Sequence, residues 1–205
     1  PLNTEDVKFK CSEKITAIKK GDGSGYWVIA HFKDKFYSFS IDETGVNETP
    51  VVTQITPNVN LGGYRRNALG CIKASPDGDK LAIAHQQFGN FPGETTFNGA
   101  VFLYDLDNNT GVLSNPIEII SNVNPYGVEF SPQGKKLYTS FTTNPTIGLG
   151  VLNQYDLLSD NIPASGITIA NTSQSSTLQL GPNGKIYRAV IQSQFLDVIN
   201  NPEED

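Results

Sequence analysis

Two histidines, His31 and His85, are the side chains of this sequence best suited to acid–base or metal chemistry near neutral pH. Each closes an apolar run that ends in Ile-Ala-His, so they are expected at equivalent places in two copies of one structural unit. A metal or hydrolytic site needs further donors that converge on it. Glu129 is the only acidic residue that the pattern places on an inner strand, so we expect structural roles for both histidines, with no bound metal and no cofactor.

The segment from Asp105 to Gly111 resembles the start of a calcium-binding loop. Asp105, Asp107 and Asn109 place side-chain oxygens at alternate positions, but the glycine comes one place late and the final glutamate is missing. An acidic turn also occupies the same place in the first unit, at Asp42. The main interpretation is therefore an Asx turn, with calcium binding as the alternative.

The chain has two cysteines, Cys11 and Cys71, and no Cys-x-x-Cys pair. A structural zinc site has no support in this pattern. A Cys11–Cys71 disulfide is geometrically conceivable if the first strands of neighbouring units meet near a common axis. A buried and inert Cys71 is the commoner outcome for such a position.

An aromatic, glycine-rich insertion at 86–99 offers the best candidates for ligand binding. It carries Phe88, Phe91 and Phe97, which are suited to anchoring a protein partner or a sugar ring. Tyr64 and Arg65, in the loop Gly62-Gly-Tyr-Arg-Arg66, are further binding candidates. The simpler alternatives are an Ω-loop that folds back on its own aromatics and a solvated Arg-Arg loop.

Three Pro-x-Gly turns reveal the elements that must position these residues. Their prolines, Pro76, Pro132 and Pro182, are 56 and 50 residues apart, and each turn separates two apolar strand-like runs. Proline fixes φ at the first corner of such a turn, and glycine accepts the positive φ that ends it. The spacing matches one four-stranded propeller blade, so we predict an all-β fold of the β-propeller class, with WD-repeat or lactonase-like blades.

The predicted strands are short and rich in β-branched and aromatic residues. Separate strands are expected at 116–120 and 126–130, where the second unit ends and the third begins. The single region 1–205 divides into blade-like units at 13–56, 67–121, 124–171 and, incompletely, 175–205. These make about three and a half to four blades of a larger ring, so other blades from the same or another chain are expected to cover the end faces.

Composition narrows the possible functions. The net charge of −6 disfavours nucleic acid as a partner. No apolar stretch reaches the roughly 18 residues that a transmembrane helix needs, and no signal-peptide pattern opens the chain. Motifs for a nucleophilic serine elbow, a phosphate-binding loop or paired glycosidase carboxylates are also missing. Because methionine is absent and the chain starts in a polar segment, we interpret it as a processed product or a fragment.

The order of several motifs resembles a known family over nearly the whole sequence. The motifs are Lys73-Ala-Ser-Pro-Asp-Gly78, Tyr126-Gly-Val-Glu-Phe-Ser-Pro132, Asn153-Gln-Tyr-Asp-Leu157 and Leu178-Gln-Leu-Gly-Pro-Asn-Gly-Lys-Ile-Tyr187. They are similar to the propeller region of large secreted proteins of gliding bacteria, which the type IX secretion system exports and which often carry a gliding-motility-type sorting domain. Residues 124–138 are more weakly similar to the repeat of lactonase-like propellers.

That resemblance implies an extracellular or cell-surface location, contact with a secretion machinery, and adhesion or binding rather than catalysis. Our first hypothesis is a noncatalytic propeller module that binds a protein or a glycan. The second is a lactonase-like or other hydrolytic propeller with its site in the central channel. An enzyme should gather several polar groups of perturbed pKa at one mouth of that channel, whereas a binding module should not.

Overall fold

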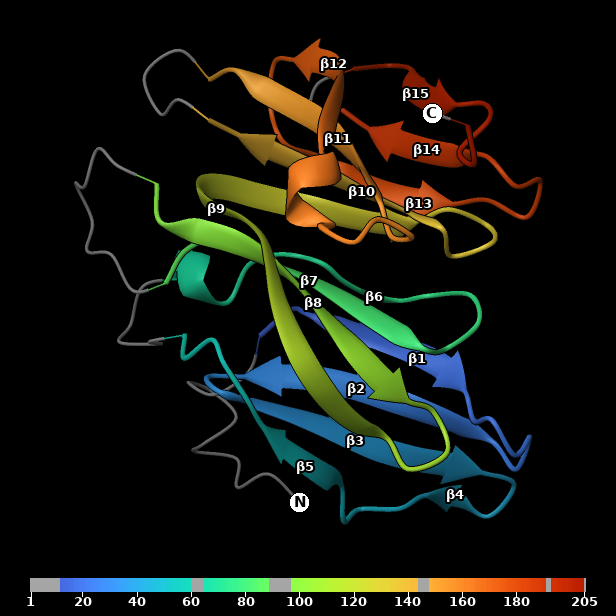
Figure 1. The fold of residues 1–205 in the computed structure, drawn as a ribbon. Coiled ribbons are helices and arrows are strands. Elements are labelled where there is room, and N and C mark those ends of the chain that lie inside the picture. The colour runs from blue at the N-terminus through green and yellow to red at the C-terminus, as the bar shows by residue number, and fades with distance from the viewer. Residues whose placement is uncertain (1–11, 60–64, 89–96, 144–147, 191–192, 205) are drawn as a thin grey trace.

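The computed structural model describes residues 12–59, 65–88, 97–143, 148–190 and 193–204. This part of the chain is built of strands and turns, with two short 3-10 helices and no α-helix, which confirms the predicted all-β class (Figure 1). The 3-10 helices are η1 (Arg65–Asn67) and η2 (Pro163–Ser165). Within the described ranges, no helix has the length and apolar character needed to cross a membrane.

The strands pair into antiparallel groups that follow one another along the chain, and we call these groups blades. Blade 1 contains β1 (Ile15–Lys19), β2 (Tyr26–Phe32), β3 (Lys35–Asp42), β4 (Gly45–Val46) and β5 (Val51–Gln54). Blade 2 contains β6 (Ile72–Ala74), β7 (Lys80–His85), β8 (Gly99–Asp107) and the first part of β9 (Val112–Phe130). Blade 3 contains the rest of β9, β10 (Lys136–Thr142), β11 (Gly150–Asp156) and β12 (Ile167–Thr172). Blade 4 contains β13 (Thr177–Leu180), β14 (Ile186–Ala189) and β15 (Leu196–Ile199).

Strand β9 corrects one expectation from the sequence. The two strands predicted at 116–120 and 126–130 are a single bent strand that belongs to two blades. Val123 still pairs with β8 of blade 2, whereas Asn124 already pairs with β10 of blade 3. The bend is made by Asn122, whose φ of 58° lies in the left-handed region that asparagine tolerates better than most residues. Because strand pairing continues on both sides of the bend, blades 2 and 3 form one continuous sheet.

The Pro-x-Gly turns have the geometry expected from their sequence. Gly78, Gly134 and Gly184 adopt φ of 82°, 68° and 76°. The amide of Gly78 donates to the carbonyl of Ser75 at 2.9 Å, and that of Gly134 donates to Ser131 at the same distance. These turns join the inner strand of each blade to its second strand, so they lie together at one end of the molecule, on the right in Figure 1.

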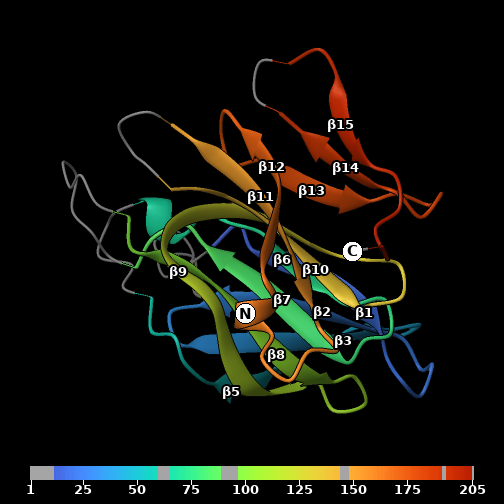
Figure 2. The same ribbon diagram turned by 45° about the horizontal axis from the view of Figure 1, so that its top comes forward.

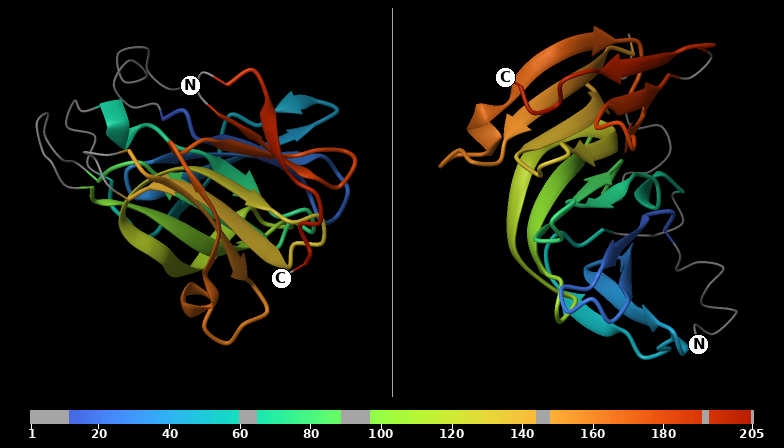
Figure 3. Two further views of the ribbon diagram at one scale, coloured as in Figure 1. Left: turned by 90° about the horizontal axis from the view of Figure 1, so that it is seen from above. Right: turned by 90° about the vertical axis from the view of Figure 1, so that its right-hand side faces the viewer.

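The blades follow an arc, with blade 1 at one end and blade 4 at the other (Figures 2 and 3). Apolar side chains fill three seams between successive blades. The first seam, between blades 1 and 2, includes Trp27, Ile29, Phe36, Ile72, Ile83, Phe102 and Tyr104. The second includes Ala82, Val101, Leu103, Val128, Phe130, Leu137 and Tyr155, and the third includes Tyr138, Leu152, Leu178 and Ile186. Each large apolar side chain buried in a seam contributes about 1.5–3 kcal/mol to stability, so the seams hold the arc together.

Candidate functional site

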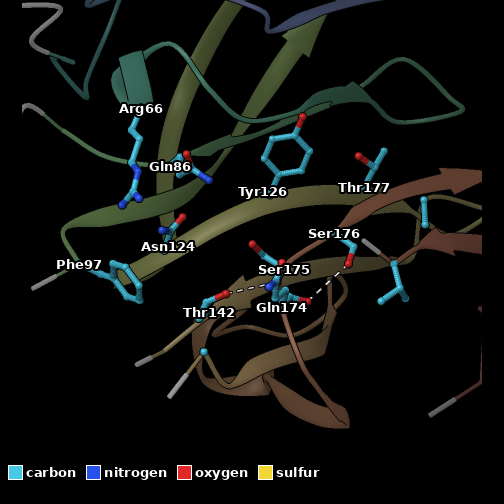
Figure 4. Close-up of a pocket in the computed structure, with 13 residues that line it drawn as sticks. Arg66, Gln86, Phe97, Asn124, Tyr126, Thr142, Gln174, Ser175, Ser176 and Thr177 are labelled. Carbon is cyan, nitrogen blue, oxygen red and sulfur yellow. Dashed lines mark hydrogen bonds between the residues drawn. The ribbon is translucent and has the colours of Figure 1, made fainter. Parts of the chain in front are cut away.

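A pocket of about 660 Å³ opens on the side of the molecule opposite the Pro-x-Gly turns (Figure 4). Inner strands begin and second strands end there, so the connections of blades 2, 3 and 4 converge on this point. The volume lies within the range of small-molecule sites. The described residues that line it are Arg66, Gln86, Phe97, Asn124, Tyr126, Thr142, Gly148, Gln174, Ser175, Ser176, Thr177, Ala189 and Val190.

Asn124 is the most informative of these residues. It lies at the bend of β9, opposite Thr142 in the strand register, and is only 9% exposed. Its side-chain oxygen Oδ1 has no hydrogen-bond partner, and Figure 4 shows the residue among Gln86, Phe97 and Thr142. A buried carbonyl oxygen without a partner costs about 1–3 kcal/mol. A ligand that donates a hydrogen bond here, with a shift of the side chains that now cover this oxygen, would recover that cost.

The segment Gln174–Ser176 forms a second, prearranged wall of the pocket. The Ser175 amide donates to Thr142 Oγ1 at 3.2 Å, and the Ser176 amide donates to Ser140 Oγ at 3.0 Å. The buried guanidinium of Arg188 donates to the Gln174 carbonyl at 2.9 Å. These contacts fix the backbone between β12 and β13 before any ligand arrives.

The pocket wall carries a tyrosine hydroxyl, that of Tyr126, that stays protonated at neutral pH. Burial, followed by the negative charges of Glu13 and Cys71, raises the pKa of the Tyr126 hydroxyl. Burial also raises the pKa of the neighbouring Cys71 thiol to about 11, so that sulfur is a poor nucleophile. None of the described residues that line the pocket is a histidine, a carboxylate or a cysteine. The described lining consists of amide, hydroxyl, guanidinium and apolar groups, which suit hydrogen bonding.

The structure separates the aromatic candidates of the insertion. Phe97 lines the pocket. Phe88 instead packs at the first seam, with its ring 5.4 Å from that of His85 and 6.4 Å from that of Phe102. Arg65 begins η1, next to the pocket residue Arg66. The remaining two candidates, Phe91 and Tyr64, lie outside the described residues.

Of the residues considered for acid–base or metal chemistry, the two histidines contact each other, whereas Glu129 does not lie with them. His31 and His85 lie buried in the first seam, away from the pocket lining. Glu129 Oε1 accepts a hydrogen bond from the Phe130 amide, and its Oε2 lies 3.1 Å from Lys73 Nζ. The histidine pair and Glu129 therefore lie in separate structural environments.

The calcium candidates diverge in the same way. Asp105 pairs with Lys80 and accepts a hydrogen bond from Asn115 Nδ2 at 2.7 Å. Asp107 instead forms an Asx turn, in which its Oδ1 accepts the amide of Asn109 at 2.9 Å. Within the described part of the chain, no three histidine, cysteine or acidic side chains gather as metal ligands would.

Cys71 is a half-buried thiol at the start of the inner strand of blade 2. Its proposed partner, Cys11, lies outside the described residues. The disulfide between them therefore stays a prediction.

Most of the pocket was missed by reasoning from sequence, including Asn124 and the 174–177 segment. A signal was available in the polar run Asn171-Thr-Ser-Gln-Ser-Ser-Thr177, which contains far more hydroxyl and amide groups than a tight connection needs. Its importance depends on blades 2, 3 and 4 bringing their connections together, which only the three-dimensional arrangement reveals.

No protein-family model matches this sequence, and no curated protein does so either. Solved structures do match the fold. A 6-phosphogluconolactonase candidate from Bacteroides uniformis is 14% identical, with a TM-score of 0.53 over 90% of this chain and 49% of that one. A glucose dehydrogenase is 16% identical, with a TM-score of 0.54 over 88% of this chain and 58% of that one. The β-propeller domain of Cps50 (Swd1) from Myceliophteria thermophila is 8% identical, with a TM-score of 0.52 over 95% of this chain and 52% of that one.

These similarities define the class of protein: the chain has the fold of a β-propeller, as its turns predict. The chain spans about half the length of the propellers it matches. Identities this low establish the fold alone, because unrelated functions share the propeller scaffold.

Proposed function

We propose that this chain is a noncatalytic β-propeller module that binds a glycan in the pocket opposite the Pro-x-Gly turns. The observation that carries the proposal is the buried Oδ1 of Asn124, which lacks a partner in a pocket lined by amides and hydroxyls. Such a site gains most from a ligand that brings its own hydrogen-bond donors.

The chemistry of the lining favours a polyhydroxylated ligand. Gln86, Asn124 and Gln174 provide amides that both donate and accept, as the hydroxyl groups of a sugar do. Phe97 adds an apolar ring against which the carbon face of a sugar can pack. Arg66 brings a positive charge to the same pocket, which favours glycans that carry carboxylate or sulfate groups.

A hydrolytic propeller is the alternative, and similarity to a 6-phosphogluconolactonase candidate is what favours it. That similarity concerns the fold. Against it stands the chemistry of the pocket, whose described lining holds no carboxylate, imidazole or thiol to serve as base or nucleophile.

We also propose that the protein acts outside the cell, at the surface or in the medium, after export by a type IX secretion system. The support is the resemblance of its repeat motifs to secreted propeller regions of gliding bacteria. Antibody labelling of intact cells, compared with cells whose export system has been deleted, tests this part. Detection only inside intact wild-type cells would refute it.

The binding proposal is tested with an array of neutral and acidic oligosaccharides, followed by calorimetry on the best binder. Asn124→Ala and Phe97→Ala should each weaken binding about tenfold, which corresponds to about 1.4 kcal/mol. Asn183→Ala is the matched control, because this asparagine lies in a Pro-x-Gly turn at the other end of the molecule and should leave affinity unchanged. The absence of any glycan ligand would refute the proposal, and lactone hydrolysis abolished by Asn124→Ala would support the alternative.

A further inference from the structure

Arg66 is the only charged residue among the described residues that line the pocket. It lies in η1 and is exposed, so its guanidinium is accessible to a ligand that enters from solvent. Figure 4 shows that guanidinium directed toward Asn124 and Phe97. The chain as a whole is acidic, with a net charge of −6. A cationic side chain in the pocket of an acidic protein favours a ligand with a negative charge at that point.

Lys14 brings a buried positive charge to the same connection. Its ammonium donates to the carbonyls of Asn67 and Leu69, which follow Arg66 in the chain. The charge of Glu13 acts on Lys14 and offsets part of this potential. Because the pocket lining itself contributes no carboxylate within the described residues, the potential at this end of the pocket is set by cations.

Arg188 places a third cation behind the 174–176 wall. It is buried and donates to the Gln174 carbonyl at 2.9 Å. Its ion-pair partner, Asp197, lies 2.6 Å away, but that carboxylate is 60% exposed, so water screens part of its charge. The wall therefore adds to the preference for an anionic ligand and does not oppose it.

Asn124 makes a second and different demand on the ligand. Its buried Oδ1 lacks a partner and can only accept, so it needs a hydroxyl or amide donor. Because the guanidinium of Arg66 points toward this residue, one ligand has to offer an anion and a donor close together. A terminal hexuronic acid does so within one sugar unit, since the ring carbon that carries the carboxylate is bonded to a carbon that carries a hydroxyl. A sulfate group offers acceptors only.

We propose that the pocket selects the terminal hexuronate of an acidic glycan and that Arg66 determines this specificity. Arg66 binds the sugar carboxylate through two parallel N–H groups, Asn124 accepts the neighbouring ring hydroxyl, and Phe97 packs against the carbon face of the ring. The inference rests on the proposed glycan-binding function and specifies the class of its ligand.

The test compares acidic sugars with their own methyl esters, which keep the sugar and remove the charge. Calorimetry uses trisaccharides of glucuronic, galacturonic, mannuronic and guluronic acid in both forms. At least one acid should bind about tenfold more tightly than its ester, because the contact with the carboxylate is a charge-assisted one. The affinity for that acid should fall as the salt concentration rises, whereas the affinity for the ester should not.

Variants then assign the preference to its residues. Arg66→Gln should bind the preferred acid about tenfold more weakly and the ester as before, so the preference disappears. Arg66→Lys retains the charge without the planar fork and should keep part of the preference. Asn124→Ala should weaken acid and ester by the same factor, since both carry the hydroxyl. Lys185→Gln is the matched control, because it removes a cation beside a Pro-x-Gly turn at the other end of the molecule. Circular dichroism checks that every variant is folded.

The outcomes separate this inference from the function on which it rests. If methyl esters or neutral glycans bind as tightly as the acids, the hexuronate specificity is overturned while glycan binding stands. If no sugar of any kind binds, the proposed function itself fails. A sulfated trisaccharide that binds more tightly than every hexuronate would overturn the choice of carboxylate. An Arg66→Gln variant that keeps the preference for the acid would overturn the role of Arg66.

Discussion

His31 and His85 lie edge to face across the first seam, with ring centroids 4.7 Å apart and both side chains buried. Nε2 of His31 and both ring nitrogens of His85 have no hydrogen-bond partner. Burial, followed by the charge of Lys14, lowers the pKa of His31 to about 3. Burial, followed by His31 and Lys14, lowers the pKa of His85 well below its ordinary value. Both rings are therefore neutral in the folded chain, and the contact between blades 1 and 2 is one between uncharged rings.

This pair predicts that the protein loses stability in mild acid. The unfolded histidines take up protons as the pH falls through about 6.5, whereas the folded ones do not, so stability rises with pH in this window. At about pH 5 the loss is up to about 2 kcal/mol for each histidine. Urea unfolding followed by the fluorescence of Trp27, the single tryptophan, measures it from about pH 7.5 to about pH 5.

His85→Leu provides the control, because it removes one of the two titrating rings and should make the pH dependence about half as steep. Asp42 and Asp107 do not obscure the result. Hydrogen bonds lower the pKa values of Asp42 and Asp107, so these groups titrate below the window in which the histidines act. A wild-type free energy of unfolding that is constant across the window would show that the histidines are not held neutral.

Lys14 should make the stability of the protein depend on pH at the alkaline end of the range. Its ammonium is buried and donates to the carbonyls of Asn67 at 3.3 Å and Leu69 at 3.2 Å. Burial lowers its pKa to about 8, below the value of 10.5 for an unperturbed lysine. Above about pH 8 the folded chain loses this proton before the unfolded chain does, so stability should rise by about 1 kcal/mol between about pH 7.5 and about pH 9. Urea unfolding at these two values measures the rise.

Lys14→Met should abolish this rise, whereas Lys19→Met, which replaces an exposed lysine of β1, should preserve it. The window ends near pH 9 for a physical reason. The pKa of Cys71 is raised above its ordinary value of 9.0, so the unfolded thiol ionises first and, above about pH 9, its contribution offsets the continuing gain from Lys14. A rise of equal size in wild type and Lys14→Met would refute the assignment to Lys14.

Glu129 links the inner strands of three blades, and its removal should be costly. Its carboxylate accepts the amides of Phe130 at 3.0 Å and Leu180 at 2.8 Å, and pairs with Lys73 at 3.1 Å. Glu129→Ala leaves two amides and a cation without this acceptor, which should lower the free energy of unfolding by about 3–5 kcal/mol. Chemical denaturation measures the change.

Lys73→Met is the matched control for that prediction. It leaves Glu129 with both amide donors, and the lysine side chain is 21% exposed, so the loss should be clearly smaller than for Glu129→Ala. If the two variants lose the same stability, the ion pair rather than the amide contacts holds the three strands together.

The sequence predicts the framework of this fold well because the signals are local. Each Pro-x-Gly turn specifies its own backbone geometry, and the strands on either side alternate or run apolar over a few residues. Strand β9 shows where local reasoning ends. Asn122 and Pro125 look like a loop between two strands, yet the residues on either side of Asn122 stay paired with β8 and β10, so the strand bends there without ending.

The pocket is harder to predict because it depends on contacts between distant segments. Arg66, Phe97, Asn124 and Gln174 come from different connections, and no spacing in the sequence indicates that they meet. The equivalent histidines were easier to interpret. Their repeated Ile-Ala-His context places them on matching strands, which the structure confirms at the ends of β2 and β7.

Gly111 lies against Trp27, and its backbone leaves no room for a side chain. A Cβ atom at this position would lie 3.1 Å from the indole ring and 3.1 Å from Cβ of Ser38. The indole itself is fixed, because its Nε1 donates to the Asn108 carbonyl at 2.8 Å. Ser38 is fixed as well, since its hydroxyl donates to the Gly111 carbonyl at 2.7 Å. Neither neighbour can therefore move away easily.

Gly111→Ala should consequently destabilise the protein more than an equivalent change at an open site. Gly23 offers that comparison, because its φ of 74° matches the 75° of Gly111 and nothing lies within 4 Å of its Cβ position. Gly23→Ala should cost about 1–2 kcal/mol for the left-handed backbone alone. Gly111→Ala should cost about 1–3 kcal/mol more through overpacking, and should shift the emission of Trp27. Urea unfolding of both variants gives the difference, and equal losses would mean that Trp27 and Ser38 yield without cost.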